Sequence, residues 1–245
     1  MKQGTFIVME NRPLADGVML MRLRGDTSEI TTPGMFVNIR LEGLFLRRPI
    51  SVCDCEGDIL TIIYKTVGTG TAQMASLTAG TYLDLLTGLG NGYDLEQAGE
   101  APLLIGGGAG VPPLYFLAKK LRERGKSVKA ILGFNKFSDV FFENEFKAIC
   151  EETVVTTVDG SYGKKGFVTD AMPAMDYSYF YCCGPEPMLR SVCIASETSG
   201  QFSFERRMGC GFGACMGCSC RTITGYKRIC KEGPVLRKEE ILWEG

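Results

Sequence analysis

The stretch LLIGGGAG, residues 103–110, decides the fold because an apolar run leads directly into a glycine turn. The segment that follows, PPLYFLAKKLRERGK, reads as an amphipathic helix whose apolar positions fall on one face: Leu114, Leu117, Ala118 and Leu121. Two prolines suit the first turn of such a helix, where amide donors have no partner to lose. Strand, turn and helix in this order predict a unit of a parallel α/β sheet.

The glycine turn is also the first candidate ligand site, formed by Gly106, Gly107, Gly108 and Gly110. Free amides at a helix N-terminus bind a pyrophosphate well, so a dinucleotide is one interpretation. An ordinary tight turn is the other, because the spacing departs from G-x-G-x-x-G and no acidic residue stands at a diagnostic position. This segment alone leaves both open.

The sequence pattern changes twice along the rest of the chain. Strand-like runs continue downstream as SVKAILGF, EETVVTTVDG and YSYFYCCGP, separated by helix-like segments around 143–151 and 169–175. Upstream, residues 5–86 hold short β-rich runs punctuated by Gly, Pro, Asp and Asn, which predict a small antiparallel β-barrel. After residue 200 the sequence is dominated by Cys and Gly. We therefore expect three domains: 1–98 as a β-barrel, 99–200 as the α/β domain and 201–245 as a small third domain.

Composition excludes several functions. The formal net charge is -1 and we find no basic run, so nucleic acid is not an expected partner. Histidine is absent, which removes the usual general base, and we assign no catalytic acid or base. Eleven cysteines without a secretory signal indicate thiols in a reducing cytoplasm. The long uncharged windows are rich in Gly, Pro or Thr, so we expect no membrane span.

The segment CGFGACMGC carries the strongest chemical signal. Cys210, Cys215 and Cys218 form a C-x4-C-x2-C run and Cys230 follows after eleven residues, the ligand spacing of a plant-type 2Fe-2S centre. Interleaved glycines let backbone amides approach the cluster sulfurs. A structural zinc site is the alternative, although its usual signature has two C-x2-C pairs and this segment has one. Cys220 is interpreted as a bystander thiol rather than a ligand.

Three weaker motifs remain. Cys183-Gly184-Pro185 follows a strand, at the end where open α/β sheets bind ligands, although a strand ending in a turn explains it equally. In the first domain, residues 47–51 (RRPIS) place two cations and a hydroxyl between strands, and residues 68–71 (GTGT) form a second flexible turn. Arginine forks and exposed amides suit a phosphate. Arg pairs and Gly-Thr turns are also common on solvated barrel rims.

With these residues in place, the chain resembles the ferredoxin reductase superfamily, and more closely the electron-transfer subunits of dihydroorotate dehydrogenase B. The similar stretches run nearly end to end: LRRPISVCD, YKTVGTGT, GLGNGYD, LIGGGAGVPPL, VDGSYGKKGFVTD, YCCGPEPML, ERRMGCGFGACMGCSC and ICKEGPVL. A related group, the small subunits of NADH-dependent ferredoxin:NADP oxidoreductases, looks to have Asp where this chain has Cys210. That difference favours the dihydroorotate dehydrogenase family.

The resemblance implies three cofactors: FAD, NAD and a 2Fe-2S cluster. The barrel would bind FAD through Arg48, Pro49, Ile50, Ser51, Gly68, Gly70 and Thr71. The second domain would hold the NAD pyrophosphate at residues 106–110 and the nicotinamide side at Asp159, Gly160, Ser161, Cys183, Gly184 and Pro185. Residues 133–136 (GFNK) lack an arginine cluster for a 2'-phosphate, which favours NAD over NADP.

The resemblance also implies a partner and a direction of electron flow. The partner is a catalytic subunit that oxidises dihydroorotate on FMN in pyrimidine biosynthesis, with two copies of each subunit in a heterotetramer. Electrons then pass through the cluster and FAD to NAD+. Two alternatives stay open: an NAD(P)H reductase subunit serving a ferredoxin, sulfur-reducing or hydrogenase partner, and a non-catalytic iron-sulfur redox sensor. Trp243 either lies on a docking face or packs on the chain's own core.

Overall fold

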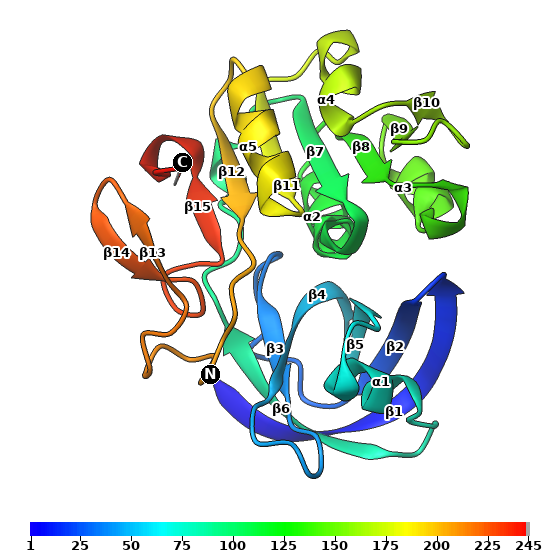
Figure 1. Cartoon of the computed structure of the whole chain (residues 1–245), viewed down its shortest axis with the longest axis vertical. Helices are drawn as coiled ribbons and strands as arrows, with labels where there is room; N and C mark the ends of the chain where they lie inside the picture. Colours follow the sequence, from blue (N-terminus) through cyan, green and yellow to red (C-terminus); the bar gives the residue numbers. More distant parts are fainter. Residues whose placement is uncertain (244–245) are drawn as a thin grey trace.

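The computed structural model describes residues 1–243, which form a barrel below an α/β sheet (Figure 1). The antiparallel barrel is closed, in the order β1-β2-β5-β4-β3-β6. Its strands are β1 (Lys2–Ala15), β2 (Val18–Arg24), β3 (Phe36–Ile39), β4 (Arg48–Glu56), β5 (Ile59–Lys65) and β6 (Tyr82–Leu89). A short helix, α1 (Thr69–Ala75), lies between β5 and β6 in the sequence. The predicted barrel is confirmed.

Alternation of side chains explains why this segment forms a barrel. In β6 every second residue is buried, beginning with Leu83 and Leu85, while the residues between them are partly exposed. A period of two sends successive side chains to opposite faces of a strand. The inward residues of neighbouring strands then meet in one core that includes Val8, Leu23 and Ile62.

The second unit is a seven-stranded sheet in the order β10-β9-β8-β7-β11-β12-β15. Its strands are β7 (Pro102–Gly107), β8 (Lys129–Phe134), β9 (Glu152–Thr157), β10 (Lys164–Lys165), β11 (Tyr179–Cys183), β12 (Gly200–Ser203) and β15 (Val235–Arg237). All pair in parallel except β15, which is antiparallel to β12. The predicted parallel α/β sheet is confirmed, with this one antiparallel strand added.

Helices connect the strands as the sequence pattern predicts. They are α2 (Pro112–Glu123), α3 (Glu143–Ile149), α4 (Val168–Ala171) and α5 (Glu186–Ala195), with short 3-10 turns at Leu95–Gln97, Gly108–Gly110, Phe137–Asp139, Met172–Ala174 and Lys238–Glu240. The expected apolar face of α2 is fully buried at Leu114, Leu117, Ala118 and Leu121. The helix-like segments expected around 143–151 and 169–175 correspond to α3 and to α4 with the following turn.

Two local expectations in the barrel were wrong. Arg48 to Ser51 do not lie between strands but open β4, because pairing with β3 gives their backbone partners that no local pattern reveals. The segment beginning at Gly68 is not a flexible turn, since Gly68 is the N-cap of α1. The hydroxyl of Thr71 accepts hydrogen bonds from the amides of Val67 and Gly68, at 2.9 and 3.2 Å, and so fixes the start of this helix.

The cysteine-rich segment departs from the sheet and returns to it. The boundary expected between residues 200 and 201 falls inside β12, and β15 beyond the cysteines pairs with that same strand. Residues 204–234 are therefore an excursion between two neighbouring strands. It carries the hairpin of β13 (Ser219–Thr222) and β14 (Gly225–Arg228), and its ends are joined by a backbone hydrogen bond of 2.9 Å from Phe204 to Pro234. None of the helices within residues 1–243 has the length and apolar character needed to span a bilayer.

Candidate redox-cofactor sites

The four predicted cluster ligands lie in the excursion as two thiol pairs. The amide of Cys215 donates to the Sγ of Cys210 at 3.4 Å, and the amide of Cys210 faces the Sγ of Cys215 at 3.5 Å. The amide of Cys230 donates to the Sγ of Cys218 at 3.4 Å. A 2Fe-2S cluster takes four thiolates, two on each iron, so the donor set fits this group. Within residues 1–243, no three Cys, Asp or Glu side chains gather around a single point as ligands of one ion.

Backbone amides prepare one of these thiols for metal binding. Burial alone would raise the pKa of Cys210, but hydrogen bonds from the amides of Phe212, Cys215 and Ala214 outweigh it and lower that pKa to about 6. The amide of Ala214 lies 3.2 Å from the Sγ atom. Burial and the neighbouring Cys218 raise the pKa of Cys230 to about 12. The thiolate is the form that binds iron, so these amide hydrogen bonds favour the metal-binding form of Cys210.

Of the predicted flavin residues, Arg48 in β4 and Gly70 in α1 lie in direct contact. A Cβ atom added to Gly70 would lie 2.0 Å from the Nε of Arg48, so the arginine side chain lies directly on this glycine. Arg47 points elsewhere, because its guanidinium forms an ion pair of 2.7 Å with Asp84 and donates to the carbonyl of Asn38 at 3.2 Å. Of the two arginines, Arg48 is the one placed to meet a ligand at the start of α1.

The glycine turn and the Cys183 motif meet at the centre of the sheet. The chain proceeds from β7 through β8 to β9 and β10 on one side, then continues through β11 and β12 on the other. Open α/β sheets bind ligands at such a switch point, beyond the carboxyl ends of the strands. Gly106 is the register partner of Cys183, and a Cβ atom on Gly110 would lie 2.2 Å from the carbonyl oxygen of Cys183.

The structure does not bring Asp159 and Gly160 to the same place as Cys183. They follow β9, which lies three strands from β11, a separation of about 14 Å at ordinary strand spacing. Asp159 accepts hydrogen bonds from the amide and hydroxyl of Ser161 at 2.9 and 2.7 Å, and these bonds lower its pKa. Next to this loop, Phe137 and Tyr162 line an open cavity of about 460 Å³.

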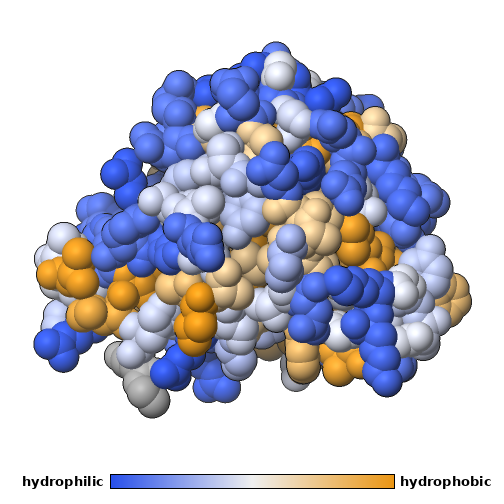
Figure 2. Space-filling model, turned by 90° about the horizontal axis from the view of Figure 1, so that it is seen from above, coloured by the Kyte–Doolittle hydropathy of each residue, from blue (hydrophilic) through white to orange (hydrophobic). Residues whose placement is uncertain are grey.

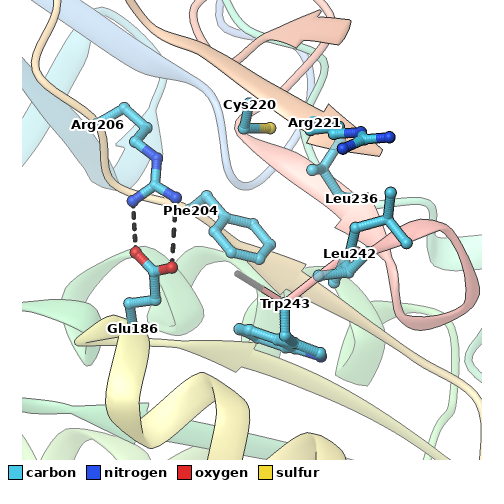
Figure 3. Close-up of a pocket in the computed structure, with 9 residues that line it drawn as sticks. Glu186, Phe204, Arg206, Cys220, Arg221, Leu236, Leu242 and Trp243 are labelled. Carbon is cyan, nitrogen blue, oxygen red and sulfur yellow. Dashed lines mark hydrogen bonds and ion pairs between the residues drawn. The ribbon is translucent and has the colours of Figure 1, made fainter. Parts of the chain in front are cut away.

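Trp243 lines a second, small cavity of about 20 Å³ (Figure 3). Its indole packs edge-on against Phe202, with ring centroids 5.7 Å apart, and donates to the Sγ of Cys193 at 3.3 Å. Trp243 therefore packs on the chain's own core. Cys220 lines the same cavity, and burial raises its pKa, whereas the net shift of the Cys210 pKa is downward.

Sequence reasoning missed two asparagines that hold the excursion to the barrel. Asn38 on β3 donates from Nδ2 to the carbonyl of Cys210 at 3.2 Å. Asn91, in the GLGNGYD loop, donates to the carbonyls of Glu232 and Val235 at 3.1 and 2.8 Å. The glycines on either side of Asn91 mark a tight turn in the sequence, but nothing local indicates a partner more than 140 residues away.

A closed barrel, a parallel sheet with a glycine turn at its switch point and two cysteine pairs define an iron-sulfur oxidoreductase of the ferredoxin reductase type. Residues 205–242 match the iron-sulfur cluster binding domain of dihydroorotate dehydrogenase B, and residues 104–194 match the oxidoreductase NAD-binding domain. The chain belongs to the family of dihydroorotate dehydrogenase B (NAD(+)) electron transfer subunits. It is 42% identical over 255 residues to the subunit from Bacillus pumilus, with 98% of each chain covered. Identity to that of Fusobacterium nucleatum is 42% over 257 residues, with 98% of this chain and 99% of the relative covered.

Solved structures agree with this assignment. The NADH-dependent reduced ferredoxin-NADP oxidoreductase, studied for flavin-based electron bifurcation, superposes with a TM-score of 0.89 at 29% identity, covering 97% of this chain and 90% of that one. The Amycolatopsis cytochrome P450 reductase GcoB shares the fold, with a TM-score of 0.69 at 24% identity over 79% of this chain and 65% of its own. The predicted cofactor set of FAD, NAD and a 2Fe-2S cluster is confirmed at the level of the domains.

Proposed function

We propose that this chain carries electrons between a catalytic subunit that oxidises dihydroorotate and NAD+. The observation that carries the proposal is the presence of three sites in one chain: the thiol pairs, the glycine turn at the switch point, and Arg48 against the start of α1. We infer dihydroorotate as the substrate because a relative that is 42% identical over 98% of the chain is named as a dihydroorotate dehydrogenase B subunit. The overall reaction is dihydroorotate plus NAD+ giving orotate, NADH and a proton.

The chemistry explains why three cofactors belong together. Nicotinamide exchanges electrons in pairs as hydride, an iron-sulfur cluster carries them singly, and a flavin can do both. The chain contains no histidine, and its own residues need move no proton from substrate carbon. Their work is to bind the cofactors, hold them at fixed separations and set the cluster potential through amide hydrogen bonds.

We assign each cofactor to the residues that its sequence motifs indicate. For FAD these are Arg48, Pro49, Ile50, Ser51, Gly68, Gly70 and Thr71, and for the cluster Cys210, Cys215, Cys218 and Cys230. For NAD, Gly106, Gly107, Gly108 and Gly110 would hold the pyrophosphate, with Cys183, Gly184 and Pro185 at the nicotinamide. Asp159 and Gly160 fit the opposite end of the same dinucleotide, because about 14 Å separates them from Cys183 at ordinary strand spacing.

The three-part division is proposed in functional rather than topological terms. Residues 1–98 would serve FAD, 99–200 would serve NAD, and 201–245 would serve the cluster. In this division β12 and β15 support the third part while remaining in the sheet of the second. All eleven cysteines are free thiols, which supports a place in the reducing cytoplasm.

The partner is proposed to be an FMN-containing catalytic subunit, with two copies of each subunit in a heterotetramer. Apolar side chains stand exposed beside the ligands, with 44% of Phe212 and 54% of Met216 accessible. Figure 2, which views the molecule from above the α/β sheet, shows that hydrophobic patches also lie among hydrophilic residues on that face. Exposed apolar surface of this kind can take part in protein contacts. A one-electron carrier near the surface is useful only where a second redox group can approach it.

Reconstitution tests the proposal directly. The full chain should bind FAD and show NADH-dependent bleaching of the flavin, and the complex with an FMN subunit should reduce NAD+ when dihydroorotate is added. The Cys210→Ala variant should retain NADH-dependent flavin bleaching and lose dihydroorotate-dependent NAD+ reduction. A chain that binds no FAD, or a complex unaffected by loss of the cluster, contradicts the proposal.

A reductase serving a ferredoxin partner is the second candidate. It is favoured by the 29% identity over 97% of this chain to the NADH-dependent reduced ferredoxin-NADP oxidoreductase. The same reconstitution distinguishes the two functions. NADH-dependent reduction of an added ferredoxin, without any response to dihydroorotate in the presence of the FMN subunit, would support this second function.

A further inference from the structure

Asn38 lies between the strand assigned to the flavin and the loop that carries the first cluster ligand. On one side its register partner in β4 is Pro49. On the other side its Nδ2 donates to the carbonyl oxygen of Cys210 at 3.2 Å, across 172 positions of sequence. The side chain is only 1% exposed. One buried amide therefore joins the two regions across which electrons must pass.

The cluster loop is shaped around this amide. Gly211 has a φ of 78°, in the left-handed region that favours glycine. A Cβ atom added there would lie 2.3 Å from the Nδ2 of Asn38, closer than any side chain can approach. The glycine next to the first ligand is thus required by contact with Asn38 as well as by its own backbone conformation. This contact fixes how closely the loop approaches the barrel.

The energetics of Asn38 separate positioning from stability. Its Nδ2 must face Cys210 because a carbonyl oxygen only accepts hydrogen bonds. The Oδ1 atom is buried and accepts no hydrogen bond from the residues that the structure describes. A buried unpaired acceptor costs free energy, and this cost offsets the free energy gained from the hydrogen bond to Cys210. Asn38 therefore contributes little to net stability while it specifies the place of the loop.

Asn91 shows what a purely structural attachment looks like at the other end of the excursion. Its side chain donates to two carbonyls and its Oδ1 accepts from the amide of Val235 at 3.1 Å, so both of its polar atoms are used. Its backbone amide donates to the carbonyl of Gly233 at 2.7 Å. This end carries the main attachment. The single bond from Asn38 acts on the ligand itself.

We propose that Asn38 is a positioning residue for electron transfer between the flavin and the cluster. This proposal rests on the proposed function. Each transfer moves one electron across the contact, and two such transfers accompany each hydride delivered to NAD+. By holding the Cys210 carbonyl against the barrel, Asn38 sets the separation and orientation of the two cofactors, on which the rate of electron transfer depends.

The test uses the full chain carrying FAD and the cluster, with Asn38→Leu as the variant. Leucine keeps the branching and the number of side-chain heavy atoms of asparagine, removes the donor to Cys210 and removes the unpaired Oδ1 acceptor. Thr87→Val is the matched control, because Thr87 is a buried barrel residue whose hydroxyl donates to the carbonyl of Lys2 at 3.3 Å. Rapid mixing with NADH under anaerobic conditions follows the flavin band, and freeze-quenched electron paramagnetic resonance follows the reduced cluster.

Two further measurements do not depend on turnover. Hydrogen exchange of residues 210–215 in the cluster-free chain should become about fivefold faster in the leucine variant, the size expected for loss of one hydrogen bond. Thermal unfolding of the same cluster-free chain should change little. If Asn38 positions the loop, hydrogen exchange becomes faster and the unfolding temperature stays the same. If Asn38 contributes to general stability, both change.

The outcomes separate the proposal from the function on which it rests. We expect NADH to reduce the flavin of the leucine variant at the wild-type rate, and the cluster to be reduced about tenfold more slowly. In Thr87→Val both rates should match the wild type. Unchanged cluster reduction and exchange in Asn38→Leu overturn the proposal. A wild-type chain that cannot pass electrons from NADH to its flavin and cluster overturns the proposed function instead.

Discussion

Lys119 on α2 donates from Nζ to both carboxylate oxygens of Asp54 on β4, at 3.0 and 2.8 Å, and also contacts Glu56. The lysine and aspartate side chains are only 19% and 16% exposed. This ion-pair cluster joins the α/β sheet, which we assign to NAD, to the barrel, which we assign to FAD. Because it is a contact between the two units, its loss tests whether their fixed relative position matters for electron transfer from nicotinamide to flavin.

Lys119→Met should destabilise the chain by about 2 kcal/mol, because it leaves the largely buried Asp54 without its cation. Flavin reduction by NADH should slow as the two units separate, while the spectrum of bound FAD stays unchanged. Lys119→Arg should restore much of both properties. Lys120→Met is the control, since Lys120 pairs with Glu123 within the same helix. Equal effects at residues 119 and 120 would argue against a junction role.

The pH dependence of this junction follows from the pKa of Lys119. Burial lowers this pKa, but hydrogen bonds to Asp54 and Glu56 outweigh burial and raise it above 10.5. A raised pKa means that the stabilisation is complete below the unfolded value and is lost as the pH rises through the folded value. The difference in unfolding midpoint between wild type and Lys119→Met should stay constant up to about pH 10.5 and narrow above it. A difference that narrows already near neutrality would exclude Lys119 as the titrating group.

Gly110→Ala should abolish NADH binding, because its Cβ would lie 2.2 Å from the backbone carbonyl of Cys183. Gly108→Ala is the informative comparison. Gly108 has a φ of 51° but open space around its missing Cβ, so alanine there should cost about 1 kcal/mol of stability. A larger KM for NADH in Gly108→Ala would report a ligand in that space. NADH kinetics identical to wild type in both variants would remove the turn from the NAD site.

Gly70→Ala should weaken FAD binding by about tenfold, because the new methyl group displaces the Arg48 side chain from the start of α1. Gly68→Ala is its control, since Gly68 has extended backbone and no atom within 4 Å of the missing Cβ. Titration of the flavin-free chain with FAD, followed by fluorescence quenching, measures both. Equal affinities in the two variants would show that Arg48 does not contact the flavin.

The purified wild-type chain should contain about two iron atoms. Cys218→Ala should lose this iron, because the substitution leaves one of the two iron atoms with a single thiolate ligand. Cys220→Ala should retain that iron and the visible cluster bands. The two cysteines are two positions apart in the sequence, so the comparison separates loss of a ligand from a change in local packing. If Cys220→Ala lost iron and Cys218→Ala kept it, Cys220 would replace Cys218 as one of the four ligands.

Sequence patterns were sufficient where structure depends on neighbours in the chain. The spacing of Leu114, Leu117 and Leu121 predicted the buried face of α2, because a helical face is defined within a few residues. The C-x4-C-x2-C run likewise indicated the matching iron-sulfur domain from a few neighbouring residues. Both signals are local, and the structure confirms the fold that they indicated.

Features that depend on distant partners could not be read from the sequence. β4 was missed because residues 48–56 contain Pro, Asp and two Cys, and only pairing with β3 and β5 makes them a strand. The contact between Asn38 and Cys210 joins positions 172 apart, so no periodicity can indicate it. The separation of Asp159 from Cys183 follows from strand order, which the sequence alone does not specify.

The return of the chain from β12 to its neighbour β15 makes the excursion separable from the sheet. Because the hydrogen bond between Phe204 and Pro234 brings the two ends of the excursion together, a short loop could bridge the same gap. The pairing of β12 with β15 therefore does not depend on the length of the segment between them, because both ends of that segment meet at one backbone hydrogen bond. Shortening or replacing the excursion should leave the sheet intact while removing the four thiols that we assign to the cluster.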